Sequence, residues 1–101
     1  MIIDLTTYLF KGPTEYARGI DYLKETYLPA KQASPGFISG LIAENGPDSV
    51  AVLLRFERLE DIKAAAAERE AHRAFVALLA ARPEHARGPN LAQSEGVALP
   101  A

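Results

Sequence analysis

Two mostly apolar runs in the middle of the chain have the length of β-strands and are joined by turn residues. The runs cover residues 37–43 and 49–54, and Asn45-Gly46 and Pro47-Asp48 lie between them. An Asn-Gly step favours the tight turn of a β-hairpin, and the Pro and Asp strengthen the turn signal. The pattern predicts two neighbouring antiparallel strands.

A further strand is predicted toward each end of the chain. Residues 2–10 are rich in β-branched and aromatic side chains, with apolar residues on both parities, which is typical of a strand covered on both faces. Residues 83–89, which begin and end with proline, are interpreted as a loop. Residues 90–99 are predicted to form the last strand, and their polar centre suits a sheet edge.

Helical patterns separate these strands. The first helix is expected to begin at Pro13 and to end or bend at Pro29, with an apolar stripe formed by Tyr16, Ile20, Leu23 and Tyr27. The second helical region follows acidic residues at 57–61, runs through an alanine-rich stretch and ends near Arg82. It is either one helix with a bend near Ala71 or two short helices in succession.

The predicted order β-α-β-β-α-β is the split βαβ unit of an α+β, ferredoxin-like fold with a four-stranded antiparallel sheet. The chain has 101 residues, so we expect a single domain over residues 1–101. Two helices cover only one face of such a sheet, and the other face would expose apolar side chains to water. We therefore predict a homodimer that forms through the sheet face and closes two sheets into a shared barrel.

Composition removes several function classes. The net charge of −2, without a basic run, argues against nucleic-acid binding. The absence of cysteine excludes disulfides, thiolate metal sites and a cysteine nucleophile, and the two histidines form no helical metal-binding pair. The first residues lack a signal-peptide pattern, and no apolar run approaches the roughly 18 residues of a membrane span. We expect a cytoplasmic protein without a membrane span, a metal or a cofactor.

Asp4, Thr6 and Tyr8 share one face of the first strand because side chains alternate with a period of two. One interpretation is a polar row that lines a ligand pocket, with Tyr8 donating a hydrogen bond and Asp4 acting as an acid or base. The alternative places Asp4 in water near the strand end and Tyr8 in the core.

His72 is the candidate for proton transfer on the second helical region, one turn before Val76. It points either into the space between helix and sheet or to the helix surface. Thr6, Arg55, Phe37 and Phe75 are candidates for ligand contact, and Arg55 can bind an anionic group or pair with Glu57. His85 is interpreted as a solvated loop residue.

Several short motifs follow one another along the chain: Asp4-Leu5-Thr6-Thr7-Tyr8, Lys11-Gly12, Tyr27-Leu28-Pro29, Pro35-Gly36-Phe37, Gly46-Pro47 and Phe56. Together they resemble the NIPSNAP family of the dimeric α/β-barrel superfamily. They span nearly the whole chain. The family usually has an arginine where this chain has Thr6, and tryptophans near Leu54 and His72. The resemblance implies a ferredoxin-like fold, a dimer and an undefined biochemical role.

Three functional hypotheses follow. The first is a small dimeric protein that binds a small apolar or aromatic ligand between sheet and helices. The second, implied by relatives in the superfamily, is a cofactor-independent monooxygenase or isomerase that acts on an aromatic or polyketide-like molecule through Tyr8, Asp4 and His72. The third is a haem-binding enzyme in which His72 takes the position of a haem-ligating histidine.

Overall fold

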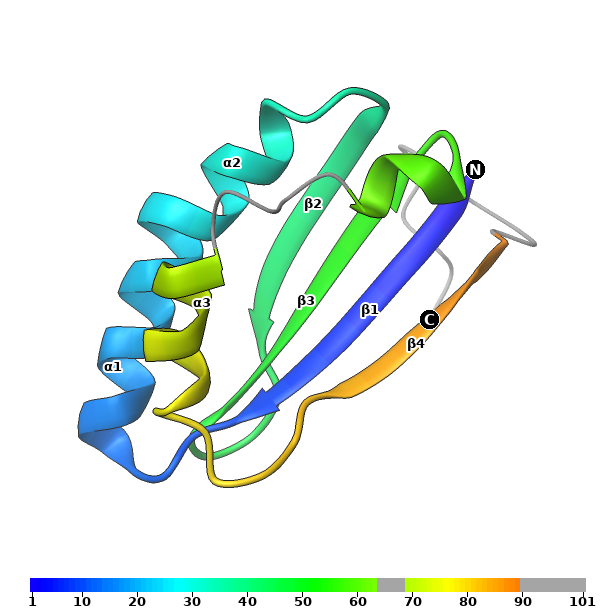
Figure 1. Cartoon of the computed structure of the whole chain (residues 1–101). Helices are drawn as coiled ribbons and strands as arrows, with labels where there is room; N and C mark the ends of the chain where they lie inside the picture. The colour runs from blue at the N-terminus through cyan, green and yellow to red at the C-terminus, as the bar shows by residue number, and fades with distance from the viewer. Residues whose placement is uncertain (64–68, 90–101) are drawn as a thin grey trace.

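The computed structural model describes residues 1–63 and 69–89 (Figure 1). The elements follow the predicted alternation of strands and helices. In chain order they are β1 (Ile2–Leu9), α1 (Pro13–Tyr22), η1 (Leu23–Tyr27), α2 (Leu28–Gln32), β2 (Phe37–Glu44), β3 (Ser49–Phe56), η2 (Leu59–Lys63), α3 (Arg69–Val76) and β4 (Glu84–Pro89).

Within residues 1–63 and 69–89 the sheet has four strands in the order β2-β3-β1-β4, and all neighbours are antiparallel. This confirms the α+β, ferredoxin-like fold. The hairpin between β2 and β3 turns where the Asn-Gly pattern predicts it. Gly46 has a φ of 109° and Asp48 a φ of 54°, and the Asn45 amide donates to the Ser49 carbonyl over 3.1 Å. Glycine adopts such a positive φ without steric cost.

The prediction of a loop over residues 83–89 is wrong, because Glu84–Pro89 forms β4. This strand pairs with β1, with Thr6 opposite His85 and Asp4 opposite Arg87. Its sequence lacks the β-branched and aromatic residues that signal a strand, so pairing with β1 overrides the weak local preference. The strand predicted at 90–99 lies outside the described residues.

The first helix continues past Pro29 to Gln32 instead of ending at the proline. The π-helical segment η1 lies directly before α2, and the Leu28 amide donates to the Leu23 carbonyl. A proline has no N–H and its ring crowds the preceding turn, so a locally wider turn lets the helix continue. Tyr27 lies in this segment.

The second helical region is helical on both sides of residues 64–68, which the structure does not describe. η2 is a short 3-10 helix, and α3 ends at Val76, before the predicted end near Arg82. Beyond α3, Leu79 forms an isolated β-bridge with Phe10. This bridge draws the chain back to the sheet and stops the helix early.

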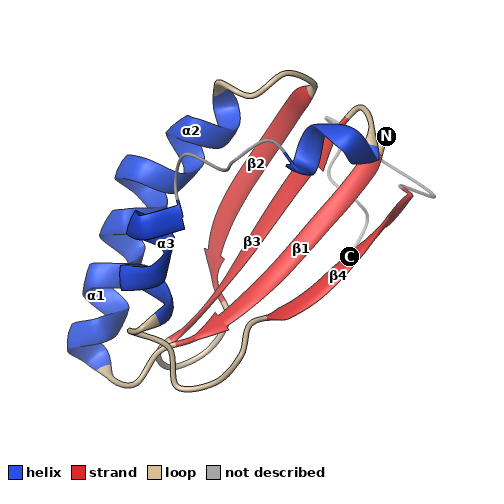
Figure 2. Cartoon of the chain, viewed as in Figure 1, coloured by secondary structure: helices blue, strands red, loops and turns tan. Residues whose placement is uncertain are grey.

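Among the described residues, helices α1, α2 and α3 lie on one face of the sheet (Figure 2). The core between them contains the even-numbered residues of β3, which are Val50, Val52, Leu54 and Phe56. α1 packs closely on the sheet, since Gly19 lies against the Phe10 ring and has no Cβ that would overlap it. On the other face, Leu5, Leu9 and Leu41 are exposed. Within the described ranges, no helix is long and apolar enough to cross a membrane.

Candidate functional site

The helix-facing side of β1 carries three buried polar residues, Asp4, Thr6 and Tyr8, which we call the β1 polar row. Their exposed fractions are 5%, 3% and 2%. The period of two that places them on one face was readable in the sequence, but their depth was not. Asp4 is therefore buried and not solvated at the strand end. Buried polar groups need partners, and β4 supplies two of them.

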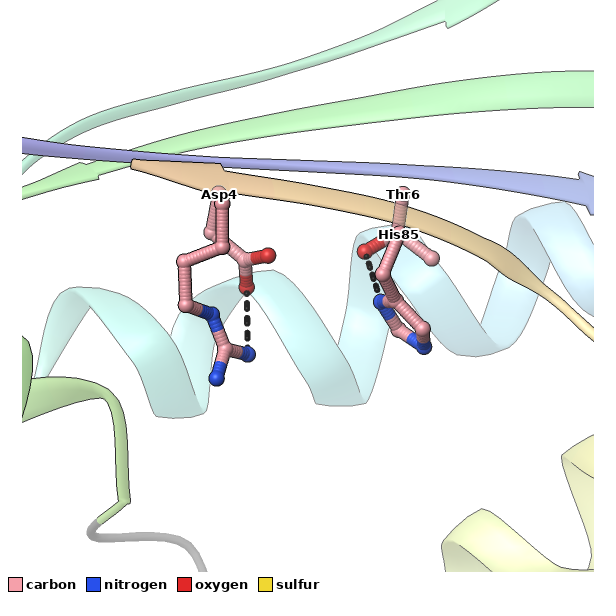
Figure 3. A network of polar contacts seen from close by, with 4 residues as sticks. Asp4, Thr6 and His85 are labelled. Carbon is pink, nitrogen blue, oxygen red and sulfur yellow. Dashed lines mark hydrogen bonds and ion pairs between the residues drawn. The ribbon is translucent and has the colours of Figure 1, made fainter. Parts of the chain in front are cut away.

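Each of two β4 side chains meets the residue opposite it on β1 (Figure 3). Thr6 Oγ1 lies 3.0 Å from His85 Nδ1. Arg87 Nη2 donates to Asp4 Oδ2 over 3.4 Å and forms an ion pair with it. Both β4 residues remain exposed. They extend the row to the surface, where a ligand can approach.

Sequence reasoning missed His85 and Arg87 as site residues. The only available signal was their spacing of two in residues 84–89, which matches Thr6 and Asp4 across an antiparallel pair. That spacing carries meaning only once the segment is known to be a strand. The prolines at its borders pointed to a loop instead.

Asp4 presents an unsatisfied acceptor inside the protein. Its Oδ2 bonds Arg87, whereas its Oδ1 is buried without a hydrogen-bond partner among the described residues. Leaving such an acceptor buried and unpaired costs about 1–3 kcal/mol. A ligand that donates a hydrogen bond to Oδ1 would remove this cost.

Tyr8 and Tyr27 bring two neutral hydroxyl groups to the row. Burial raises the pKa of Tyr8 to about 12, while hydrogen bonds with Tyr27 and Thr6 oppose that rise. Burial raises the pKa of Tyr27 still further, followed by the charges of Tyr8 and Asp4 and the hydrogen bond to Tyr8. Both phenols therefore stay protonated near neutral pH.

Aromatic rings from the helices surround the Tyr8 end of the row. Phe75 of α3 is buried, meets Tyr8 edge to face at 4.9 Å and stacks on Tyr22 at 4.8 Å. The His72 ring lies 5.8 Å from Phe75 and 6.5 Å from both Tyr22 and Tyr27. His72 thus lies between α3 and the helical segments α1 and η1, and its role in proton transfer stays a prediction.

The surroundings of His72 do not fit a haem. Three aromatic rings lie within 6.5 Å of the imidazole centre. A macrocycle bound to this imidazole would need the space that these rings fill. We therefore derive no chemistry through haem.

Two candidate ligand contacts lie away from the row. Arg55 is on the outer face of the sheet, where its Nε donates to Ser39 Oγ over 2.6 Å. Phe37 lies at the start of β2 and packs edge to face against Phe56 at 5.7 Å. The structure brings together Asp4, Thr6, Tyr8, His72 and Phe75 from the predicted set, but neither Arg55 nor Phe37.

A groove of about 420 Å³ lies between α1 and the hairpin, apart from the row. Its lining residues are Tyr16, Ala17, Ile20, Asp21, Lys24, Ile42, Ala43, Glu44 and Val50. Its charged residues Asp21, Lys24 and Glu44 are exposed and do not converge on a buried point. We place the candidate site at the β1 polar row, because an unpaired acceptor and protonated donors meet there.

No protein-family model and no curated protein matches this chain. Solved structures do match it. SnoaB, a cofactor-independent oxygenase from Streptomyces nogalater, is 13% identical with a TM-score of 0.79, covering 94% of this chain and 97% of that one. A Streptomyces coelicolor monooxygenase in complex with nanaomycin D is 17% identical with a TM-score of 0.72, covering 99% and 92%.

A third similar structure is a dimeric ferredoxin-like protein from an uncultured marine organism. It is 11% identical with a TM-score of 0.73, covering 95% of this chain and 92% of that one. At such identities the likeness shows the shared fold. The structural neighbours are thus ferredoxin-like proteins that include dimers and oxygenases.

Proposed function

We propose that this protein binds a planar, hydroxylated aromatic molecule against the β1 polar row. The buried Asp4 Oδ1, which lacks a partner among the described residues, carries the proposal, because it is ready to accept a hydrogen bond. The protonated Tyr8 hydroxyl nearby suits a ligand oxygen as acceptor. The half-exposed rings of Tyr22 and His72 beside the row suit contact with an aromatic ligand.

A second candidate function is cofactor-independent oxygenation of the bound molecule, which the two oxygenases of the same fold favour. Removal of a proton from an acidic C–H bond of an aromatic ketone leaves an electron-rich carbanion, and a protonated tyrosine stabilises its oxygen. This carbanion then reacts with O2. Overall, a CH2 group and O2 give a carbonyl group and water. Return of the proton to another carbon would instead give isomerisation.

Ligand binding can be tested with dithranol, a planar dihydroxyanthrone with phenolic hydroxyls and an acidic CH2 group. The chain has four tyrosines and no tryptophan, so quenching of tyrosine fluorescence reports binding. We expect Tyr8→Phe to weaken binding about 10-fold, as expected for one lost hydrogen bond. Tyr16→Phe, in the groove beside α1, is the matched control. If Tyr16→Phe weakens binding and Tyr8→Phe does not, the ligand occupies the groove and the proposal fails.

Oxygen uptake separates the two functions. With an oxygenase, dithranol and O2 are consumed in equal amounts and the corresponding anthraquinone appears. Binding without oxygen uptake above the uncatalysed rate would reject oxygenation and leave the binding function.

The assembly that we propose is a homodimer through the outer sheet face, as the resemblance to the NIPSNAP family also implies. Leu5, Leu9 and Leu41 expose apolar surface there, around the less exposed Leu53. An apolar sheet face of this kind is stabilised by a second copy. Leu41→Lys should give monomers in sedimentation experiments at micromolar concentration. Leu59→Lys, at an equally exposed leucine outside the sheet, is the control; monomeric wild-type protein would sink the proposal.

A further inference from the structure

His85 occupies a position from which it can exchange a proton with a ligand at the row. It lies on β4 opposite Thr6, and its Nδ1 is 3.0 Å from the buried Thr6 hydroxyl. The imidazole is exposed, and its Nε2 has no hydrogen-bond partner in the part of the chain that the structure describes. One ring nitrogen is therefore fixed to the sheet and the other is accessible.

One tautomer of His85 suits a base. When Nδ1 carries the imidazole proton and donates it to the Thr6 hydroxyl, Nε2 has the free lone pair of a base.

We propose that His85 is the proton acceptor of this site and that Thr6 is its positioning residue. This inference rests on the proposed function. In the step, the acidic C–H or O–H bond of the ligand breaks, and its electron pair stays on the ligand as an enolate or phenolate. The proton forms a bond with Nε2 and leaves an imidazolium whose Nδ1–H is held by Thr6. The Tyr8 hydroxyl, which stays protonated, can donate a hydrogen bond to the developing anion.

The position of His85 suits this role better than that of His72. His72 is only partly exposed and lies among three aromatic rings. His85 lies between the Asp4 and Tyr8 positions of the row and is open to solvent. A catalytic base must return its proton to water after each turnover, which an exposed nitrogen does readily.

Charged groups of several elements lie on the helix-facing side around the row. On the paired strands they are Asp4 of β1 and Arg87 of β4, whereas Glu84, opposite Thr7, lies on the other side of the sheet. From the helices, the Lys31 ammonium of α2 lies 5.3 Å from the Tyr27 ring centre and the His72 ring of α3 lies 6.5 Å from it. Asp4 and Arg87 form an ion pair and largely cancel.

The test compares His85→Gln, His72→Gln and Glu84→Gln in the full-length protein with dithranol. The ultraviolet–visible spectrum of the bound anthrone gives the pH at which it ionises, and oxygen uptake gives turnover. We expect His85→Gln to move ionisation to higher pH and to lower kcat by about 10²–10⁴-fold, which is typical for loss of a general base. Glu84→Gln, the neighbouring residue on β4, should match wild type in both measurements.

The positioning role of Thr6 has its own signature. Thr6→Val should lower kcat about 10-fold with little change in KM, because the ring orientation is lost while the ligand contacts remain. Thr6→Ser, which keeps the hydroxyl, should restore kcat. A Thr6→Ser variant as slow as Thr6→Val would assign Thr6 a packing role only.

The outcomes separate the two proposals. Wild-type protein that does not bind dithranol overturns the proposed function and this inference together. Wild-type protein that binds and ionises dithranol, with His85→Gln unchanged or with His72→Gln carrying the loss, overturns the assignment of His85 alone. Thermal unfolding of each variant identifies any that fail to fold. If His85→Gln fails to fold, His85→Asn replaces it in the same measurements.

Discussion

The two faces of β1 differ in chemistry although their residues alternate along one strand. Asp4, Thr6 and Tyr8 face the helices, are buried, and bond to partners on β4 and η1. Leu5 and Leu9 face away and are exposed. The polar residues are therefore inside and the leucines outside, the reverse of the usual distribution.

This reversal indicates that the two faces of β1 have different roles. Burying polar side chains is costly unless they are hydrogen-bonded, and Asp4 Oδ1 is buried without a partner among the described residues. Exposing leucines is costly unless a partner covers them. The inner face thus suits ligand chemistry and the outer face suits association. The following predictions test this division, from the largest expected effect to the smallest.

Leucines on opposite faces of the sheet should respond differently to truncation. Leu54, 1% exposed in the core, should lose about 2–5 kcal/mol of unfolding free energy on substitution by alanine, at any protein concentration. Leu41→Ala on the outer face should destabilise mainly where dimers form. Urea unfolding at two protein concentrations measures this, and a concentration-independent loss for Leu41→Ala would contradict the division.

Alkaline pH should act through the inner face. Tyr8 has a pKa of about 12 in the folded protein and an ordinary value of 10.0, so its stabilising contribution is complete below pH 10. As the pH rises from 10 to 12, the unfolded chain loses this proton first. Stability then falls by about 1.4 kcal/mol per pH unit for this group. In a plot of unfolding free energy against pH, the decline for Tyr8→Phe should be less steep than for wild type by this amount. Parallel declines would argue against a buried Tyr8 hydroxyl.

The Asp4–Arg87 pair should respond asymmetrically to loss of each partner. Arg87→Met leaves the carboxylate of Asp4 buried without a counter-ion and should cost about 1–3 kcal/mol. Asp4→Asn leaves the partly exposed Arg87 free to contact water and should change stability by less than about 1 kcal/mol. The double variant should recover most of the Arg87→Met loss in urea unfolding. An additive double variant would show that the pair does not interact.

The smallest effect is expected on the outer face, at the hydrogen bond between Arg55 and Ser39. Ser39→Ala removes the acceptor of the Arg55 Nε, and both residues are only partly buried. We expect a loss below about 1 kcal/mol, because water can replace the hydroxyl. Thermal unfolding measures this loss of stability. A larger loss would show that this polar contact contributes substantially to the stability of the outer face.

Much of the fold could be predicted from local patterns, because the hairpin turn and the alternation of strands and helices are written in neighbouring residues. The hairpin at residues 37–56 and the helical stripe from Tyr16 to Tyr27 illustrate this. β4 could not be predicted in the same way, since residues 84–89 carry no strand pattern and gain their conformation from pairing with β1. The continuation of the helix past Pro29 likewise depends on a π-helical turn.

For the site, the sequence by itself determined that Asp4, Thr6 and Tyr8 share a face, because the period of a strand is two. Only the tertiary structure decided that this face is buried against the helices, that His85 and Arg87 complete it, and that Arg55 lies on the other side of the sheet. The reason is physical: periodicity relates residues within one strand. Burial and cross-strand contacts depend on segments that are about 80 residues apart and that only the folded chain brings together.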